Sequence, residues 1–194
     1  QIVIDRTDLI VLGIFAETDA IAIYNAGARS AGLVIVILTA MNALCASKIA
    51  ALYKSGDIEG LRTLIRGVLK WTFWPSLIMT IMIIFLSENI MSLFGEEFKE
   101  GNIILVILAI SQLINVAAGP VMILMNMTGN QNSTATVLGI AAVTNLILNF
   151  IFIPIWGVLG AAIATGATIV FWNLWLAVIV KRRIGICCFV LTKC

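Results

Sequence analysis

The chain has 194 residues, of which 61% are hydrophobic and 11% are charged, and its formal net charge is +2. Ordinary globular proteins carry roughly 25% charged residues, so this composition excludes a water-soluble domain. No Asp, Glu, Lys or Arg occurs between residues 101 and 180, and the chain contains no His. We therefore predict an all-α, polytopic membrane protein that is not an enzyme, with no catalytic or metal site, no cofactor and no nucleic-acid partner.

The first two apolar segments differ in length. Residues 1–12 are too few to cross a bilayer, which takes about 20 helical residues, so they are interpreted as the far end of a truncated helix. An acidic loop is predicted over residues 13–19. Residues 20–53 form an apolar run without proline. At about 1.5 Å per residue this helix is longer than a bilayer core, and we expect it to leave the membrane near Lys48 and Lys54.

A polar break over residues 55–57 separates this helix from the next, which Asp57 is suited to cap. Over residues 58–70, apolar residues recur at helical spacing and three bases lie four residues apart on another stripe. This pattern predicts a short amphipathic helix at the membrane surface. A separate spanning helix is predicted over residues 71–87, with Pro75 in its first turn.

The rest of the chain predicts one acidic loop, residues 88–101, and three uncharged spanning helices, residues 102–125, 133–153 and 158–180. The first of these helices contains Gly119 followed by Pro120, which predicts a kink. With residues 20–53 and 71–87, the total is about five full transmembrane helices after the truncated one.

Basic residues gather at two places along the chain: Lys48, Lys54, Arg62, Arg66, Lys70, and then Lys181, Arg182 and Arg183. The positive-inside rule assigns both groups to the cytoplasm. Four predicted crossings separate the two groups, and an even number agrees with this assignment. The acidic loops are then predicted to lie outside, and the protein to reside in the cytoplasmic (inner) membrane.

Four charged residues fall inside apolar segments: Asp5, Arg6, Asp8 and Arg29. Arg29 lies roughly 13 Å along its helix from the outer end, where a charge costs about 2.5–3.5 kcal/mol. The antiparallel order of the two helices allows these residues to meet. One interpretation is a structural ion cluster, and the other is a cavity lining that contacts a charged substrate or coupling ion.

Polar residues also mark the uncharged helices. Gln112 and Asn115 lie on one helical face beside Ser111, and Asn145 and Asn149 lie four residues apart on another. Both sets fit hydrogen bonds between helices, worth about 0.6 kcal/mol each. Both also fit a stripe that binds a sugar or an ion.

Seven stretches, taken in order and spacing, resemble the second half of polysaccharide (O-antigen-type) flippases of the multidrug/oligosaccharidyl-lipid/polysaccharide superfamily. They are DRTDLIVLG at 5–13, YNAGAR at 24–29, AALYKSGD at 50–57, LFGEEF at 93–98, LMNMTG at 124–129, GVLGAAIAT at 157–165 and KRRIG at 181–185. The resemblance covers residues 1–186, and the cysteine-containing tail over residues 187–194 has no counterpart and no assigned structure.

The resemblance implies a MATE-like transporter of 12 to 14 helices in two six-helix lobes. This chain would be the C-terminal lobe, with the N-terminal lobe as its missing partner. The substrate implied is a lipid-linked oligosaccharide, moved across the bilayer by alternating access with ion-gradient coupling. Arg6 and Arg29 would then meet phosphates, and Asp5 and Asp8 would carry a proton or Na⁺. Four residues would meet sugar hydroxyls: Gln112, Asn115, Asn145 and Asn149.

Three alternatives remain open. A multidrug or cation exporter of the same superfamily would favour acidic over basic cavity residues. A membrane-embedded glycan-processing enzyme would need a large catalytic loop, whereas the longest predicted connector has roughly 15 residues. The third alternative is a scaffold that does not transport.

Overall fold

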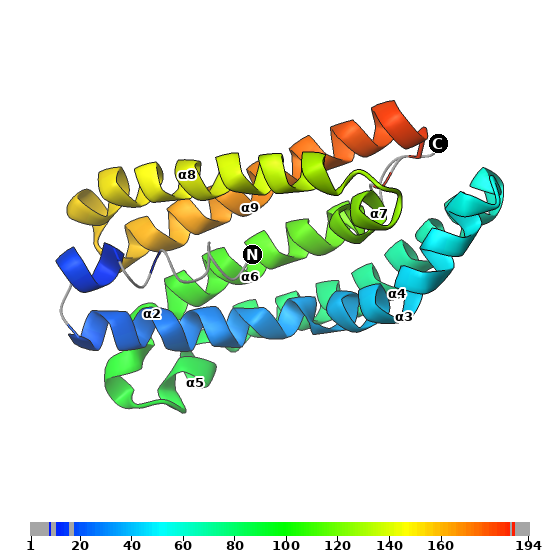
Figure 1. Ribbon diagram of the computed structural model, residues 1–194. Helices are drawn as coiled ribbons and strands as arrows, with labels where there is room; N and C mark the ends of the chain where they lie inside the picture. Colours follow the sequence, from blue (N-terminus) through cyan, green and yellow to red (C-terminus); the bar gives the residue numbers. More distant parts are fainter. Residues whose placement is uncertain (1–7, 9–10, 16–17, 187, 189–194) are drawn as a thin grey trace.

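The computed structural model describes residues 8, 11–15, 18–186 and 188, and this part of the chain is almost entirely helical and contains no strand. Figure 1 shows long helices packed side by side into a bundle. Five segments are long and apolar enough to cross a membrane: Thr18–Lys54, Ile58–Phe85, Glu96–Ala118, Gln131–Trp156 and Val158–Ile184. The prediction of an all-α membrane bundle with five full spans is confirmed.

The elements in chain order are α2 (Thr18–Ala31), η1 (Gly32–Ile35), α3 (Val36–Lys54), α4 (Ile58–Phe85), α5 (Ser87–Ser92), η2 (Glu96–Gly101), α6 (Asn102–Ala118), α7 (Val121–Met127), α8 (Gln131–Trp156) and α9 (Val158–Ile184). Residues 11–15 are helical as well, and α2 begins at Thr18, so the loop predicted over residues 13–19 is wrong at both of its ends. Phe15 extends the apolar segment and packs edge-to-face on Phe150 of α8, with ring centroids 5.9 Å apart.

The first span is a helix with a tighter turn in its middle. The predicted continuous helix over residues 20–53 begins at Thr18, and the four-residue 3-10 segment η1 interrupts it. Ser76 Oγ on α4 donates a buried hydrogen bond of 2.8 Å to the carbonyl oxygen of Val34 within η1. The neighbouring helix therefore bonds to the backbone where the regular helical ladder changes.

Helix α4 is continuous over 28 residues, so the predicted division into a surface helix and a separate span is wrong. Asp57 caps its start as predicted and accepts a 2.8 Å hydrogen bond from the Gly60 amide. Nothing in the sequence near Lys70 breaks a helix, and Pro75 lies well inside α4. A proline there removes one backbone donor and crowds the preceding turn, a disturbance that can bend a helix without ending it. The buried stripe that begins with Leu61 continues past this point to the far end of the helix.

The predicted acidic loop over residues 88–101 is also mostly helical. It contains α5 and the 3-10 segment η2, joined at Gly95, where φ is 142°. Lys99 Nζ forms a 2.5 Å ion pair with Glu96 across one turn of η2. Most of the connector therefore hydrogen-bonds its backbone N–H and C=O groups within its own helical turns before α6 begins.

The predicted kink at Gly119 and Pro120 is a complete break between α6 and α7. Gly119 has φ 71° and ψ −157°, a conformation that is essentially restricted to glycine. Pro120 then precedes α7. Later, Gly157 with φ 57° reverses the chain between α8 and α9, while Pro154 stays inside α8. The ends of both helices lie a few residues beyond those predicted.

Buried apolar residues form two clusters. One joins α3, α4, α7, α8 and α9 and includes Ile49, Leu61, Leu124 and Leu176. The other joins α2, α6, α8 and α9 with residues 11 and 12 and includes Tyr24. Helix α6 contacts α2, α4 and α9, and it runs between them in Figure 1. The second cluster encloses the polar site described below.

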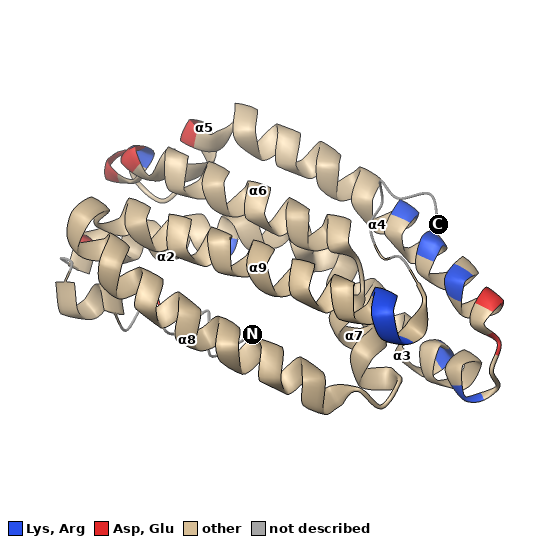
Figure 2. Cartoon of the chain, turned by 90° about the horizontal axis from the view of Figure 1, so that it is seen from above, with Lys and Arg blue, Asp and Glu red and all other residues tan. Residues whose placement is uncertain are grey.

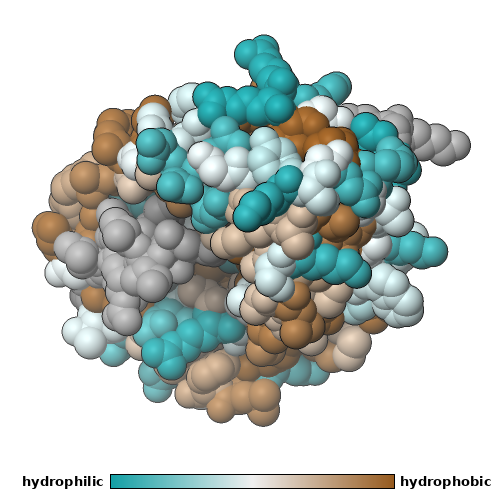
Figure 3. Space-filling view, turned by 45° about the vertical axis from the view of Figure 1, so that its right-hand side comes forward, coloured by the Kyte–Doolittle hydropathy of each residue, from teal (hydrophilic) through white to brown (hydrophobic). Residues whose placement is uncertain are grey.

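Charged residues lie mainly at the two ends of the bundle. Figure 2 shows most Lys and Arg near the α3–α4 connection and the end of α9, and a group of acidic residues near α5 at the opposite end. Figure 3, with the first of these ends brought forward, shows hydrophilic side chains gathered beside apolar surface. The segregation of charge expected from the sequence is therefore present. The broad uncharged zone between the ends suits a bilayer.

Candidate functional site

A buried carboxylate is the centre of the site. Asp8 is 1% exposed and accepts three hydrogen bonds from neutral groups. The Tyr24 hydroxyl donates to Oδ2 over 2.7 Å, the Thr165 hydroxyl to the same oxygen over 2.5 Å, and the Asn149 amide to Oδ1 over 2.6 Å. The donors come from α2, α9 and α8, so one carboxylate near the start of the chain joins α2 to two helices more than 120 positions away.

The local sequence explains why these donors converge. Asn145 and Asn149 are four residues apart on α8 and therefore share a face, and both are fully buried. The Asn149 amide also donates to Asn145 Oδ1 over 3.0 Å. On α9, Gly160 allows the closest approach to α8, because a Cβ there would collide with the carbonyl oxygen of Phe152. Close packing through small residues is typical of membrane helices, and it brings Thr165 to the site.

Two polar atoms of this site remain buried without a hydrogen-bond partner: Asn145 Nδ2 and Asn149 Oδ1. Leaving such an atom unpaired costs about 1–3 kcal/mol, so two neighbouring cases indicate a site adapted to more than the packing of helices. Carboxylate, amide and hydroxyl oxygens are the ligands of hard cations. Among the described residues, no three or more His, Cys, Asp or Glu side chains lie together so that they could hold a metal ion. One carboxylate with amide and hydroxyl oxygens is a donor set that fits a proton or an alkali cation.

The predicted meeting of Arg29 with Asp8 does not occur. Arg29 is exposed near the end of α2, and its Nε donates to Asn25 Oδ1 over 3.1 Å within the same helix. The described ion pairs do not include Arg29. The oxygens of Asp8 are taken by Tyr24 and the other neutral donors, so an ion cluster of these two residues is excluded. Asp5 and Arg6 lie outside the described residues.

The polar face predicted on α6 is present but separate from Asp8. Asn115 is 3% exposed and donates through Nδ2 to Gln112 Oε1 over 3.2 Å. Ser111, one turn earlier, returns its hydroxyl to the carbonyl of Ile107 over 2.8 Å. The same hydroxyl lies against Gly166 of α9. This face therefore packs on α9, and no hydrogen bond in the described part of the chain links Gln112 or Asn115 to Asp8.

Sequence reasoning missed two of the three donors to Asp8. Tyr24 and Thr165 fall inside the resembling stretches 24–29 and 157–165, but neither was singled out. A threonine in an apolar helix usually bonds to its own helix backbone, and a tyrosine hydroxyl, at the end of a long side chain, gives no local indication of its partner. The available signal was the small residues close to both positions, Ala26 and Gly27 after Tyr24 and Ala164 and Gly166 beside Thr165, because small residues mark where one membrane helix approaches another.

Comparison with known proteins identifies relatives of this chain. The family model MatE matches residues 1–155. The chain is 28% identical over 167 residues to "Probable flippase AglR" of Haloferax volcanii, and 31% identical over 166 residues to "Probable low-salt glycan biosynthesis flippase Agl15" of the same organism. Each match covers 81% of this chain and 34% of the relative, so the chain spans about a third of the length of these curated relatives.

No solved structure matches the chain at a significant level. The family model, however, covers well over half of it. The five long apolar helices agree with that match, because they describe a multi-pass membrane protein. The chain therefore belongs to the MatE family.

Proposed function

We propose that residues 1–186 are the C-terminal six-helix lobe of an ion-coupled flippase that moves a lipid-linked oligosaccharide across the cytoplasmic membrane, with residues 187–194 as a tail. The observation that carries this proposal is the buried Asp8 and its neutral donors from three helices. Membership of the MatE family supports a transporter rather than an enzyme. The printed names of the two relatives support a flippase that serves glycan biosynthesis. The partner needed for transport is an N-terminal lobe.

The coupling step is assigned to Asp8. A bound proton or Na⁺ neutralises the carboxylate and changes which atoms it attracts. With a proton, one Asp8 oxygen becomes a donor, and the unpaired Oδ1 of Asn149 is an available acceptor. With Na⁺, the oxygens of Thr165 and Asn145 would turn toward the ion. Either change alters how α2, α8 and α9 pack, so ion occupancy can favour one of two lobe conformations.

Substrate contact is assigned to other residues. Arg29 carries a permanent charge, and its hydrogen bond to Asn25 within α2 uses Nε, so its two terminal nitrogens suit a phosphate. Gln112 is half-buried beside Asn115 and suits sugar hydroxyls. Arg6 and Asp5 keep their proposed phosphate and ion roles. Asn145 and Asn149, in contrast, are fully buried against Asp8, so we now assign both to the ion site.

The test uses the full-length protein in liposomes that contain a lipid-linked oligosaccharide and carry an H⁺ or Na⁺ gradient. We expect Asp8→Asn to abolish the dependence of translocation on the gradient while substrate still binds. Arg29→Gln should weaken substrate binding, whereas Arg66→Gln, which removes an exposed arginine from α4, should not. Gradient-dependent transport by Asp8→Asn would overturn the coupling role. Export of a cationic dye without glycan translocation would favour the multidrug alternative.

A further inference from the structure

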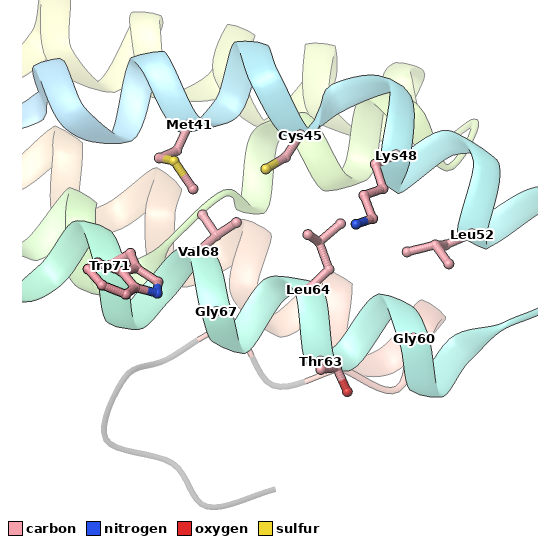
Figure 4. A pocket seen from close by; sticks show the side chains of 10 residues that line it. All are labelled: Met41, Cys45, Lys48, Leu52, Gly60, Thr63, Leu64, Gly67, Val68 and Trp71. Atoms are coloured by element: carbon pink, nitrogen blue, oxygen red, sulfur yellow. The ribbon is translucent and has the colours of Figure 1, made fainter.

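A groove on the flank of the bundle has no role in the proposed transport site. It lies between α3 and α4 and has a volume of about 550 Å³. Most of its wall is apolar, formed by Met41, Cys45, Leu52, Leu64, Val68 and Trp71. Figure 4 shows these side chains facing one another across the space between the two helices. We refer to it as the α3–α4 groove.

One cation lines this apolar space. Lys48 belongs to the wall of the α3–α4 groove, and Figure 4 shows its ammonium nitrogen directed into the groove beside Leu64. The ion pairs of the described residues join Arg62 to Glu59 and Lys99 to Glu96, and Lys48 is in neither. The groove therefore presents an uncompensated positive charge within an otherwise apolar lining.

The position of Lys48 along α3 defines an outer end of the groove, near the end of the helix, and an inner end. Helix α3 ends at Lys54, six residues later, which is about 9 Å along the axis. A lysine at that depth can extend its ammonium toward the interface while its stem stays in apolar surroundings. The groove continues inward to Met41 and Trp71, so from residue 41 to residue 52 it runs about 16 Å. Its occupant must be negatively charged near Lys48 and apolar on the inner side of Lys48, toward Met41 and Trp71.

We propose that the α3–α4 groove binds an anionic phospholipid, with one acyl chain between the two helices and the headgroup phosphate on Lys48. Both helices are membrane spans, so bilayer lipid reaches the groove directly. Basic pockets between helices at the cytoplasmic side of membrane proteins bind anionic headgroups. Other basic residues at the same end of the bundle, including Lys54 and Arg66, add to the attraction. The proposal depends on membrane insertion and does not require the transport function.

The absence of a side chain at Gly67 keeps the α3–α4 groove open. Gly67 lines the groove, and a Cβ added there would meet no atom within 4 Å. Leucine at this position would fill the space of the acyl chain, and it favours helix more than glycine does. Gly139 on α8 is a matched control, because it is also helical and free of atoms within 4 Å of an added Cβ, and it is exposed where Gly67 is half-buried. Gly139→Leu adds the same side chain outside the groove.

The experiment is native mass spectrometry of the full-length protein in detergent, titrated with phosphatidylglycerol or phosphatidylcholine. We expect one phosphatidylglycerol to bind tightly and Gly67→Leu to lose it, while Gly139→Leu retains it. Lys48→Ala should weaken phosphatidylglycerol binding about fivefold, the effect of one lysine on an anionic lipid. It should weaken phosphatidylcholine binding less, because the choline ammonium offsets the charge of that phosphate, and Lys48→Arg should restore the affinity. Lys54→Ala, which removes an exposed lysine outside the groove, should cause a smaller loss.

Four results would overturn the proposal. Equal binding by Gly67→Leu and Gly139→Leu would exclude an acyl chain in the groove. Equal losses for Lys48→Ala and Lys54→Ala would exclude a specific phosphate contact, and this comparison remains valid if Gly67→Leu fails to fold. Phosphatidylcholine bound as tightly as phosphatidylglycerol would exclude charge selection. Displacement of the lipid by equimolar polyprenyl phosphate would assign the groove to the transported substrate instead.

Discussion

Replacing Gly119 by alanine is expected to destabilise the protein by about 2–6 kcal/mol, through two separate effects. The φ of 71° and ψ of −157° at this residue strain any side chain, at about 1–3 kcal/mol. A Cβ there would also collide with Cδ2 of Leu69. Leu69 is only 4% exposed, so it has little room to move, and overpacking of this kind costs about 1–3 kcal/mol.

A double-mutant cycle separates the two effects. Leu69→Ala alone should cost about 2–5 kcal/mol, because it leaves a cavity. Gly119→Ala combined with Leu69→Ala should cost less than the sum of the single changes by about 1–3 kcal/mol, since the collision is gone. Gly129→Ala is the control: its φ is 79°, and an added Cβ would meet nothing within 4 Å. It should cost only about 1–2 kcal/mol.

The quantity to measure is the free energy of unfolding of the full-length protein in mixed micelles, titrated with dodecyl sulfate. Single changes at Gly119 and Leu69 that add within about 0.5 kcal/mol would refute the predicted collision. A loss for Gly119→Ala no larger than that for Gly129→Ala would refute the reasoning as a whole. The break between α6 and α7 would then not depend on glycine.

Two further predictions concern individual contacts. Ser76→Ala removes the hydrogen bond to the Val34 carbonyl and should lower the free energy of unfolding by about 0.6–1.7 kcal/mol. Thr80→Val is the control, since Thr80 bonds only within α4; an equal loss would contradict a special role for Ser76. Burial raises the pKa of the Cys188 thiol from 9.0 to about 12. In a variant with Cys188 as the only cysteine, alkylation at pH 8 should be about a thousandfold slower in the folded than in the unfolded protein, because the raised pKa leaves little thiolate. Labelling at similar rates in both states would contradict this.

The number of spans could be predicted from the sequence, because hydrophobicity and charge act locally along the chain. A run without charge from residue 101 to residue 180 has few possible arrangements in a bilayer. The boundary predicted between residues 70 and 71 is wrong because local composition alone does not decide where a helix ends. A change from amphipathic to uniformly apolar sequence looks like a new element, yet the backbone at Lys70 has no reason to stop being helical. Pro75 likewise removes a single donor and does not end α4.

The site could be predicted only in part. Asp8 and the pair of asparagines on α8 were recognised from their own chemistry and spacing. Their contact depends on how α8 and α9 return to the beginning of the chain, and Thr165 lies 157 positions away from Asp8. Opposite charge suggested Arg29 as the partner of Asp8, but in a low-dielectric interior short neutral donors held by close packing satisfy a carboxylate as well. The sequence does not encode that choice locally.

The long separation between Asp8 and its donors also has a consequence for biosynthesis. Tyr24 follows Asp8 soon, but Asn149 and Thr165 are made 141 and 157 residues later. At about 5–20 residues per second, translation needs roughly 8–30 s to reach them. During that time the first segment holds a carboxylate that a bilayer centre disfavours by about 2.5–3.5 kcal/mol. The nascent chain therefore either retains this segment at the insertion machinery or shelters Asp8 with Tyr24 until α9 is made, so that Thr165 of α9 is the last of the three donors to reach Asp8.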